Sequence, residues 1–280
     1  MSFFFILSIF HVKEIYFLEH PKHECLSYRV FDNVYICRFA SFSMKAVILC
    51  AGYATRLYPL TVNKPKALLP IKNRLLLDYT VERISKYVDE IIVISNSKFY
   101  RSFVGWRKKY KNIRVLNDGT DSNENRLGGI GDLWLAIKKE EINEDLLVVL
   151  GDNLFDFDLK EYIETFNKNK KTLIGLYELD LPEIRKMSEV KISDGKIVNF
   201  EEKPKNPETG MASIGIYIFS KSDLAELEDY MKTDKPKDGP GYFVKYLCSI
   251  QDVYPHIFKG KWYDIGSIET YKEVNNSWEN

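Results

Sequence analysis

Several features are scarce in this 280-residue chain, and each scarcity excludes a class of protein. The 40 basic and 40 acidic residues leave no net charge, which argues against a strongly basic nucleic-acid binder or a protein held on an anionic membrane. Four cysteines are too few for a disulfide framework, so we expect a cytoplasmic protein. The N-terminal apolar run is too short to span a bilayer. The remaining composition, 45% hydrophobic and 29% charged, is typical of a globular protein.

The first 43 residues differ from the rest of the chain. They hold none of the 15 glycines but 8 of the 17 phenylalanines, and this composition ends abruptly at Met44. We therefore expect an N-terminal extension over residues 1–43 and one domain over residues 44–280. Our hypothesis is that the extension is not part of the functional protein. Mass spectrometry of the native N-terminus tests it, and finding the extension at full abundance would contradict it.

From Met44 onward, short apolar runs alternate with amphipathic patterns. This order predicts an α/β fold with a mostly parallel sheet covered on both faces. The predicted strands are 45–50, 90–95, 112–116 and 146–150, and the predicted helices are 75–86, 99–109, 130–139 and 159–166. After Thr172 the spacing changes and predicts a mixed or antiparallel extension of the same sheet. Its predicted strands are 172–179, 196–202, 213–219 and 253–258, and its predicted helices are 221–231, 243–250 and 269–275.

A loop suited to phosphate follows the first predicted strand. Ala51 and Gly52 are small, which lets backbone N–H groups approach phosphate oxygens. Thr55 and Arg56 come next, and Arg56 can neutralise phosphate charge with a planar fork of donors. Lys66, between prolines, supplies a second cation. The loop is neither a P-loop nor a Rossmann fingerprint, so on its own it also fits a plain surface loop.

Two carboxylates follow strand-like segments. Asp152 comes directly after the run 146–150, and Asp264 lies about 110 residues further on. Ligands of open α/β sheets bind beyond the carboxyl ends of the strands, and Mg²⁺ prefers oxygen ligands there. Aspartate is also a common turn former, so each motif alone is compatible with a purely structural role.

Taken together and in order, the motifs resemble those of the sugar-1-phosphate nucleotidylyltransferases, of the glucose-1-phosphate thymidylyltransferase type. The resemblance covers residues 44 to about 275. It implies a single three-layer Rossmann-like nucleotidyltransferase domain. The motifs that carry it are Gly52-Tyr53-Ala54-Thr55-Arg56-Leu57, Pro65-Lys66-Ala67, Gly151-Asp152-Asn153, Phe200-Glu201-Glu202-Lys203-Pro204 and Trp262-Tyr263-Asp264-Ile265-Gly266.

The resemblance also implies the roles of individual residues and the ligands. The expected substrates are a nucleoside triphosphate and a sugar 1-phosphate, the expected cofactor is Mg²⁺, and the products are a nucleotide sugar and pyrophosphate. The implied catalytic residues are Arg56, Lys66 and Asp152, with Asp152 and Asp264 as metal ligands. The implied nucleotide-binding residues are Ala51, Gly52, Thr55 and Gly129, and the implied acceptor-binding residues are Glu202, Lys203 and Gly215.

The chain departs from the family pattern in three places. Ala54 replaces a second glycine, Ala67 replaces a proline, and Ser188-Glu189-Val190 stands where hexose-phosphate enzymes carry Tyr-Gly-Val. Because a carboxylate such as Glu189 could meet a cationic head group, a cytidylyltransferase acting on phosphocholine, or on inositol phosphate, is an alternative. A non-catalytic subunit that binds nucleotide sugars is a second one. The base, the acceptor and a homo-oligomeric state stay open, and neither nucleic acid nor a membrane is expected as a partner.

Overall fold

The computed structural model describes residues 5–8, 25–31, 34–39 and 44–279 of the chain. Within the first 43 residues, three strands pair in the order β1-β3-β2. Their bounds are β1 Phe5–Ser8, β2 Cys25–Phe31 and β3 Val34–Phe39. The boundary at Met44 coincides with the start of the first strand of the main sheet and stays a prediction.

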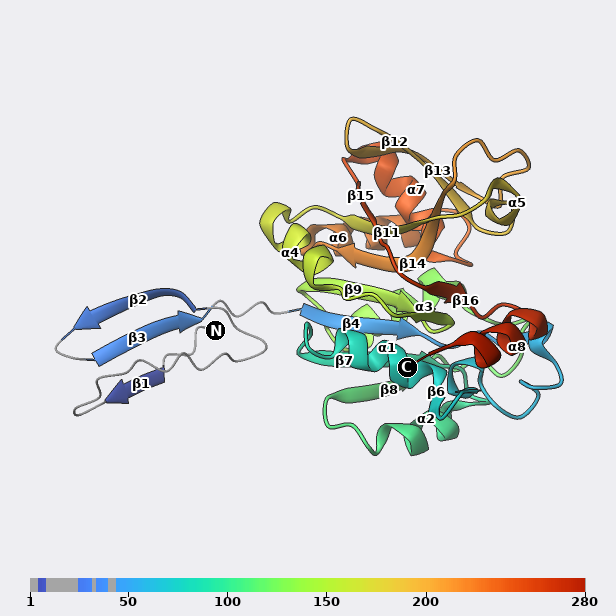
Figure 1. Cartoon of the computed structure of the whole chain (residues 1–280), viewed down its shortest axis with the longest axis horizontal. Coiled ribbons are helices and arrows are strands. Elements are labelled where there is room, and N and C mark those ends of the chain that lie inside the picture. The colour runs from blue at the N-terminus through green and yellow to red at the C-terminus, as the bar shows by residue number, and fades with distance from the viewer. Residues whose placement is uncertain (1–4, 9–24, 32–33, 40–43, 280) are drawn as a thin grey trace.

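A nine-stranded sheet forms the centre of the protein (Figure 1). Seven strands follow the order β13-β12-β14-β9-β4-β7-β8, while β11 pairs with β14 and β15. The four strands β9, β4, β7 and β8 are parallel, and β14, β12 and β13 extend them antiparallel, which confirms the predicted change after Thr172. The strands of this sheet are β4 Met44–Leu49, β7 Glu90–Ser95, β8 Ile113–Asn117, β9 Asp145–Leu150, β11 Leu173–Glu178, β12 Ser188–Ser193, β13 Lys196–Glu202, β14 Met211–Phe219 and β15 Tyr254–Ile257.

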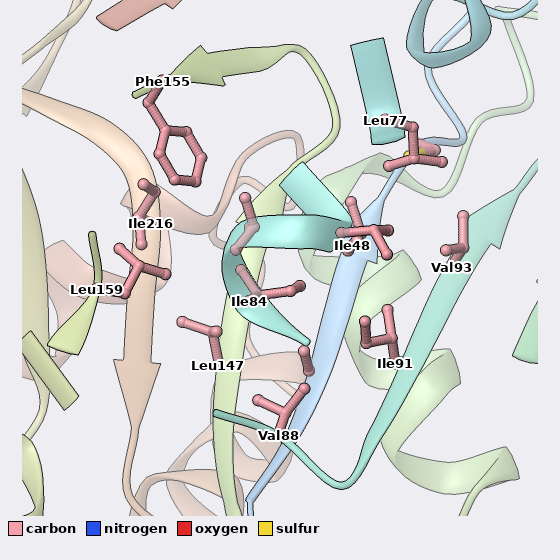
Figure 2. Close-up of a cluster of buried hydrophobic side chains, with 14 of the residues drawn as sticks. Ile48, Leu77, Ile84, Val88, Ile91, Val93, Leu147, Phe155, Leu159 and Ile216 are labelled. Atoms are coloured by element: carbon pink, nitrogen blue, oxygen red, sulfur yellow. The ribbon is translucent and has the colours of Figure 1, made fainter. Parts of the chain in front are cut away.

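Helices cover both faces of the sheet because its central strands are apolar on both sides. On β4, Ile48 faces a core shared with α1, α2 and α4, whereas Val47 faces a core shared with α3, α6 and α7. Figure 2 shows the first core, where Leu77 and Ile84 of α1 lie over Ile48, Ile91 and Val93. The helices are α1 Leu76–Ile84, α2 Tyr100–Arg107, α3 Gly128–Lys139, α4 Lys160–Asn169, α5 Leu181–Ile184, α6 Lys221–Met231, α7 Pro240–Ile250 and α8 Ile268–Ser277.

Several short elements lie outside the predicted ones. The strand β12 was not predicted because its sequence, SEVKIS, carries little apolar signal. Two pairs of very short strands add local structure, β5 Pro70–Ile71 with β6 Arg74–Leu75 and β10 Asn153–Phe155 with β16 Trp262–Asp264. None of the helices in the described ranges is long and apolar enough to cross a membrane.

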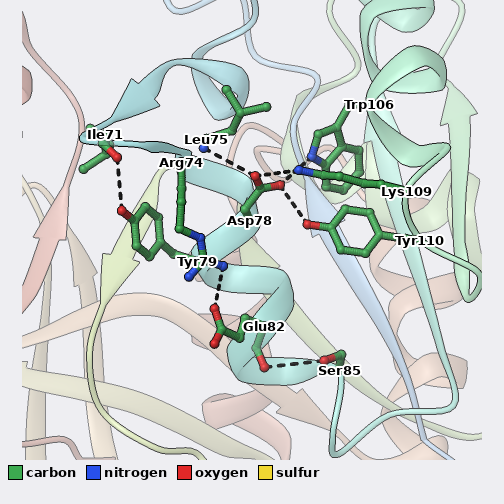
Figure 3. A network of polar contacts seen from close by, with 10 residues as sticks. All are labelled: Ile71, Arg74, Leu75, Asp78, Tyr79, Glu82, Ser85, Trp106, Lys109 and Tyr110. Carbon is green, nitrogen blue, oxygen red and sulfur yellow. Dashed lines mark hydrogen bonds and ion pairs between the residues drawn. The ribbon is translucent and has the colours of Figure 1, made fainter. Parts of the chain in front are cut away.

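The buried carboxylate of Asp78 fastens α1 to α2 (Figure 3). It accepts hydrogen bonds from Trp106 Nε1 at 2.7 Å and Tyr110 Oη at 2.8 Å, and Lys109 Nζ lies 2.7 Å away. On the same helix, the buried Thr80 hydroxyl donates to the carbonyl of Asn153 at 3.2 Å. The network therefore holds the helix that supports β10.

Candidate active site

The predicted phosphate loop follows β4 and is tied down at both ends. Asn96 Nδ2 donates to the carbonyl of Ala51 at 2.8 Å, and the buried Thr61 hydroxyl donates to the carbonyl of Ala54 at 2.8 Å. Ala54 has a φ of 48°, the left-handed region that favours glycine, which explains why the family places a glycine there. Gly52 is exposed with open space around it, so its backbone remains approachable.

Two short 3-10 helices carry the cations of the loop. Thr55 and Arg56 lie on the turn Thr55–Leu57, where both side chains are exposed. Lys66 begins the turn Lys66–Leu68, and its Nζ lies 2.7 Å from Oδ2 of Asp152. A loop cation and a strand-end carboxylate that are 86 residues apart are thereby brought together.

The antiparallel pair β10–β16 brings the two predicted metal ligands to one place. In this pair Asn153 faces Asp264, and the N–H of Ile265 donates to the carbonyl of Asp152 at 3.0 Å. The side chain of Asn153 is buried and accepts a hydrogen bond from Trp262 Nε1 at 2.8 Å. These backbone and side-chain contacts fix the segment that carries Asp152 against the segment that carries Asp264.

The electrostatics of this pair fit a bound cation. Burial and the nearby charge of Asp152 raise the pKa of Asp264 to about 6, while Lys66 and Arg56 oppose the shift. The buried Oδ1 of Asp264 has no hydrogen-bond partner within residues 44–279. No cluster of three or more His, Cys, Asp or Glu side chains in the described ranges could hold a metal. Asp152 and Asp264 are therefore two carboxylates on adjoining segments, and a cation bound there would need further ligands from outside the described residues.

The predicted acceptor residues lie at the end of β13 and on β14, two strands that both pair with β12. Ser188 of β12 faces both Glu202 of β13 and Ser213 of β14, so their side chains share one face of the sheet. Burial raises the pKa of Glu202, against a hydrogen bond from Ser188 and the charge of Lys203. Lys203 is exposed, and its backbone N–H donates to the carbonyl of Met187 at 2.8 Å.

Gly215 lies where this face meets the carboxylate pair. Its φ is +70°, and a Cβ there would lie 2.5 Å from Leu150 Cδ1 and 3.1 Å from Asn153 Nδ2. Any larger residue would therefore strain the backbone and press on the strand end that carries Asp152.

Three hydroxyl residues, Ser188, Ser213 and Tyr217, were not among the predicted acceptor-binding residues. Tyr217 is buried, and its hydroxyl accepts a hydrogen bond from Ser213 at 3.5 Å. Burial raises the pKa of Tyr217, and the charges of Glu202 and Asp152 raise it further. The alternation of a strand was the available signal, because residues 213, 215 and 217 point to one face.

The base-contacting residue that the resemblance implied is engaged within the protein. The N–H of Gly129 donates to the carbonyl of Asp238 at 2.7 Å, and the N–H of Ile130 donates to that of Lys237 at 3.0 Å. The segment 237–239 thus covers the start of α3. In this structure the N–H of Gly129 is not free to meet a base.

Glu189, which motivated the alternative acceptor, points away from the candidate acceptor residues. It is 2% exposed, and its Oε1 accepts hydrogen bonds from the N–H groups of Glu208 and Thr209. Its cross-strand partners are Glu201 and Ala212, on the opposite face from Ser188. The carboxylate therefore anchors the loop after β13 and lies on the face opposite Ser188 and Glu202.

Comparison with known proteins identifies the family. A family model for nucleotidyl transferases matches residues 45–280. The chain belongs to this nucleotidyl transferase family. It is 30% identical over 233 residues to the bifunctional protein GlmU of Methanocaldococcus jannaschii, covering 83% of this chain and 53% of that protein. It is 31% identical over 254 residues to a glucose-1-phosphate adenylyltransferase of Clostridium novyi, covering 83% of this chain and 66% of that one.

The fold of this family member also matches solved structures. A UDP-glucose pyrophosphorylase crystallised with UDP-glucose superposes with a TM-score of 0.71 at 22% identity, covering 84% of this chain and 98% of that one. The chain spans 53% and 66% of the length of the two curated relatives. The comparisons therefore establish the family and the fold.

Proposed function

We propose that this nucleotidyl transferase joins a nucleoside monophosphate from a nucleoside triphosphate to a sugar 1-phosphate, and releases pyrophosphate. The observation that carries the proposal is the assembly of four charged groups at one strand edge. Lys66 lies 2.7 Å from Asp152, and the charges of Arg56, Lys66 and Asp152 all act on the carboxylate of Asp264, whose buried Oδ1 has no hydrogen-bond partner within residues 44–279. The names of the curated relatives, which include a glucose-1-phosphate adenylyltransferase, support the same class of reaction.

The proposed chemistry needs no covalent intermediate and no strong general base. A phosphate oxygen of the acceptor is already ionised and attacks the α-phosphorus in line, while the bond to pyrophosphate breaks. Catalysis then consists of positioning and charge stabilisation. Ala51, Gly52 and Thr55 would hold the triphosphate with backbone N–H groups, and Arg56 and Lys66 would stabilise its developing charge.

We propose that Asp152 and Asp264 hold Mg²⁺. When bound there, Mg²⁺ would neutralise phosphate charge and orient the reacting oxygens. Lys66 would then exchange its contact with Asp152 for one with a phosphate oxygen. For Gly129 to contact the base as well, the segment 237–239 would have to withdraw from the start of α3.

On the acceptor side, Lys203 would bind the phosphate and Glu202 would accept hydrogen bonds from sugar hydroxyls. Ser188 faces both Glu202 and Ser213, and the hydroxyl of Ser213 donates to that of Tyr217, so a row of hydroxyl groups starts beside Glu202 and suits a neutral acceptor with many hydroxyls. We favour a sugar 1-phosphate over phosphocholine because Glu189 is committed to the N–H groups of Glu208 and Thr209. We place the reaction in the cytoplasm, since Cys50 and Cys248 are free thiols.

A matrix of five nucleoside triphosphates against phosphorylated acceptors tests the proposal, read by pyrophosphate release with Mg²⁺. The acceptors are hexose 1-phosphates, an N-acetylhexosamine 1-phosphate, inositol phosphate and choline phosphate. We expect turnover with one or more sugar 1-phosphates. Faster turnover with choline phosphate would favour the cytidylyltransferase alternative. Nucleotide-sugar binding without pyrophosphate release in any combination would favour a non-catalytic subunit.

A further inference from the structure

Each of the four charged residues of the candidate active site is followed, one to three residues later, by a side chain buried in one small hydrophobic core. This core is separate from the two cores that cover the faces of the central sheet. Because side chains in a close-packed core cannot shift independently, the core fixes the spacing of the four charges. The four buried side chains are each at most 3% exposed, and they are Leu57, Leu69, Leu154 and Ile265.

Helix α8 and the residue after it close this core. Val274 of α8 is completely buried, and Trp278, which follows the helix, is 4% exposed. The helix starts soon after Asp264, where the hydroxyl of Ser267 caps its first turn by accepting the N–H of Thr270 at 3.2 Å. Figure 1 shows α8 beside β6 and β16. The last helix of the described residues therefore packs against the segments that carry the site.

Trp278 joins α1 to β16 through its rings. It meets the ring of Tyr79 edge to face with 5.8 Å between centroids, and that of Tyr263 in the same way at 6.2 Å. Tyr263 directly precedes Asp264 and lies opposite Leu154 in the β10–β16 pair. The buried Nε1 of Trp278 has no hydrogen-bond partner in the range 44–279. Trp278 therefore acts through packing, and its N–H contributes nothing that a phenyl ring would lose.

Hydrogen bonds also tie α8 to the β5–β6 hairpin, which directly follows the second of the two cation-bearing turns. The hydroxyl of Tyr271 donates to the carbonyl of Pro70 at 2.8 Å. The N–H of Lys72 donates to Oδ1 of Asn275 at 2.6 Å, and its Nζ donates to the carbonyl of Asn276 at 2.7 Å. One helix thus holds the hairpin on one side and β16 on the other.

We propose that α8 and Trp278 form a clamp that positions the four charged residues relative to one another for nucleotidyl transfer. Trp278 acts through Tyr263 and the small core, so it is a positioning residue and not a catalytic one. Misplacing a reacting or stabilising group by about 1 Å can cost about 100-fold in rate. The role in turnover rests on the proposed function, whereas the clamping of the segments does not.

The acceptor side lies outside the clamp, which separates this role from a general structural one. On β13, Phe200 packs into the core shared with α3, α6 and α7, and Glu202 lies two residues further along the same strand. We therefore expect loss of the clamp to lower kcat and to leave the KM for the acceptor unchanged.

Three variants of the whole protein test the clamp. Trp278→Ala removes the rings, and Trp278→Phe keeps one of them. Phe166→Ala is the matched control, because Phe166 on α4 is 1% exposed and packs in a different core. The following Lys170 pairs with Asp145 at the amino end of β9, so Phe166 lies at the opposite end of the sheet from the site. Each variant is assayed at a temperature where circular dichroism shows it to be folded.

Pyrophosphate release and urea unfolding give the first readout. We expect Trp278→Ala to lower kcat by about 10- to 100-fold, with a KM for the acceptor within about twofold of that of the unsubstituted protein. Trp278→Phe should restore kcat to within about threefold. Phe166→Ala should lower the urea midpoint about as much as Trp278→Ala does, because both delete a buried aromatic side chain, but should keep kcat within about threefold.

Hydrogen exchange without any ligand gives the second readout. The N–H of Leu69 donates to the carbonyl of Lys66 at 3.0 Å, and the N–H of Ile265 donates to that of Asp152 at 3.0 Å. In Trp278→Ala both amides should exchange about tenfold faster, while the amides of β4, β7 and β9 keep their rates, because only the clamped segments open. Phe166→Ala should leave both amides unchanged.

An equal acceleration of exchange in the central strands of Trp278→Ala would overturn the proposal. An equal loss of kcat in Phe166→Ala would do the same, because Trp278 would then only stabilise the domain. If the unsubstituted protein releases no pyrophosphate with any substrate pair, the proposed function fails, while the exchange rates still decide whether α8 clamps the segments.

If Trp278→Ala does not fold, Tyr271→Phe replaces it, since it loses only the hydrogen bond to Pro70. It should lower kcat by about threefold and accelerate the exchange of Leu69, as expected for one hydrogen bond. Ser277→Ala is its control, because the Ser277 hydroxyl donates to the carbonyl of Glu273 within α8 at 2.9 Å. Equal kcat values and exchange rates in these two variants would contradict the clamp.

Discussion

The two sides of the candidate active site are built by different structural means. On the nucleotide side, Arg56, Lys66 and Asp152 lie on loops and strand ends at the carboxyl edge of parallel strands, where Arg56 is exposed and the ion pair of Lys66 with Asp152 is partly buried. On the acceptor side, Ser188, Glu202 and Ser213 meet through the register of antiparallel strands. Parallel strand ends gather loop residues from distant parts of the chain, whereas paired strands align side chains in rows. The first side is therefore suited to a highly charged phosphate chain, and the second to the fixed hydroxyl pattern of a sugar.

The largest effect that we expect from a single substitution is a loss of turnover on the nucleotide side. We expect Asp152→Asn to lower kcat by about 10²–10³, the cost of removing one group that stabilises transition-state charge. The unfolding free energy should change by less than about 1 kcal/mol, since Asp152 is half-buried and its ion pair with Lys66 is partly solvated. Pyrophosphate release and urea unfolding measure the two quantities. Asp158→Asn, an exposed acid paired with Lys86, is the control. Near-normal turnover by Asp152→Asn would remove the assigned role.

A substitution on the acceptor side should change the KM for the acceptor and leave nucleotide binding unchanged. We expect Glu202→Gln to raise that KM by about 10- to 100-fold, as for the loss of a charged hydrogen bond, with an unchanged Kd for the nucleotide. Glu201→Gln is a matched control, because Glu201 lies next in the chain and on the opposite face of β13. Steady-state kinetics with varied acceptor measure the effect. If both variants raise KM equally, the assignment of faces on β13 is wrong.

The same contrast explains what the sequence could predict. The apolar runs at residues 45–50, 90–95 and 146–150 predicted the central parallel strands, because strands buried on both faces carry an unbroken apolar signal. Motifs at the ends of those strands could then be placed at one edge without knowing any register. The ion pair between Lys66 and Asp152 lies at that edge.

The arrangement of the acceptor side could not be predicted, because the sequence of one strand does not reveal how it pairs with its neighbours. The strand β12 went unpredicted, since Ser188, Glu189 and Lys191 look like a polar loop. The antiparallel pairing decides that Ser188 faces Glu202 and that Glu189 faces the other way. Tyr217 is a comparable case, since its contact with Ser213 depends on the backbone of β14 at Gly215, whose φ is +70°.

A third prediction concerns Asp78, which holds α1 against α2 and lies outside the candidate active site. We expect Asp78→Asn to lower the unfolding free energy by about 3 kcal/mol, because it leaves three donors facing a neutral amide. Burial opposes ionisation, but hydrogen bonds from Lys109, Trp106 and Tyr110 lower the pKa of Asp78 below 3.8. The contribution of the Asp78 carboxylate to the unfolding free energy is therefore complete above pH 4 and is lost as the pH falls below 4.

Urea unfolding of Asp78→Asn at pH 7 and pH 3 measures this contribution, and the difference from the unsubstituted protein should shrink at the lower pH. Glu82→Gln is the control on the same helix, since its ion pair with Arg74 is exposed and should contribute less than about 0.5 kcal/mol. A pH-independent difference would mean that packing of α1 and not the ionised carboxylate of Asp78 holds the helices together.

The smallest expected effect is the one that separates sugar from choline as the acceptor. Glu189 accepts two backbone hydrogen bonds through one oxygen, and an amide oxygen in Glu189→Gln can accept both. We therefore expect less than about a twofold change in the KM for the acceptor and a loss of about 1 kcal/mol in unfolding free energy, measured by steady-state kinetics and urea unfolding. Glu208→Gln, an exposed acid paired with Lys191, is the control for charge. If Glu189 instead met a cationic head group, removing its charge would abolish turnover of choline phosphate and leave hexose 1-phosphates unaffected. The carboxylate of Glu189 on β12 instead accepts hydrogen bonds from two N–H groups in the loop that follows β13, and these donors already stabilise its negative charge.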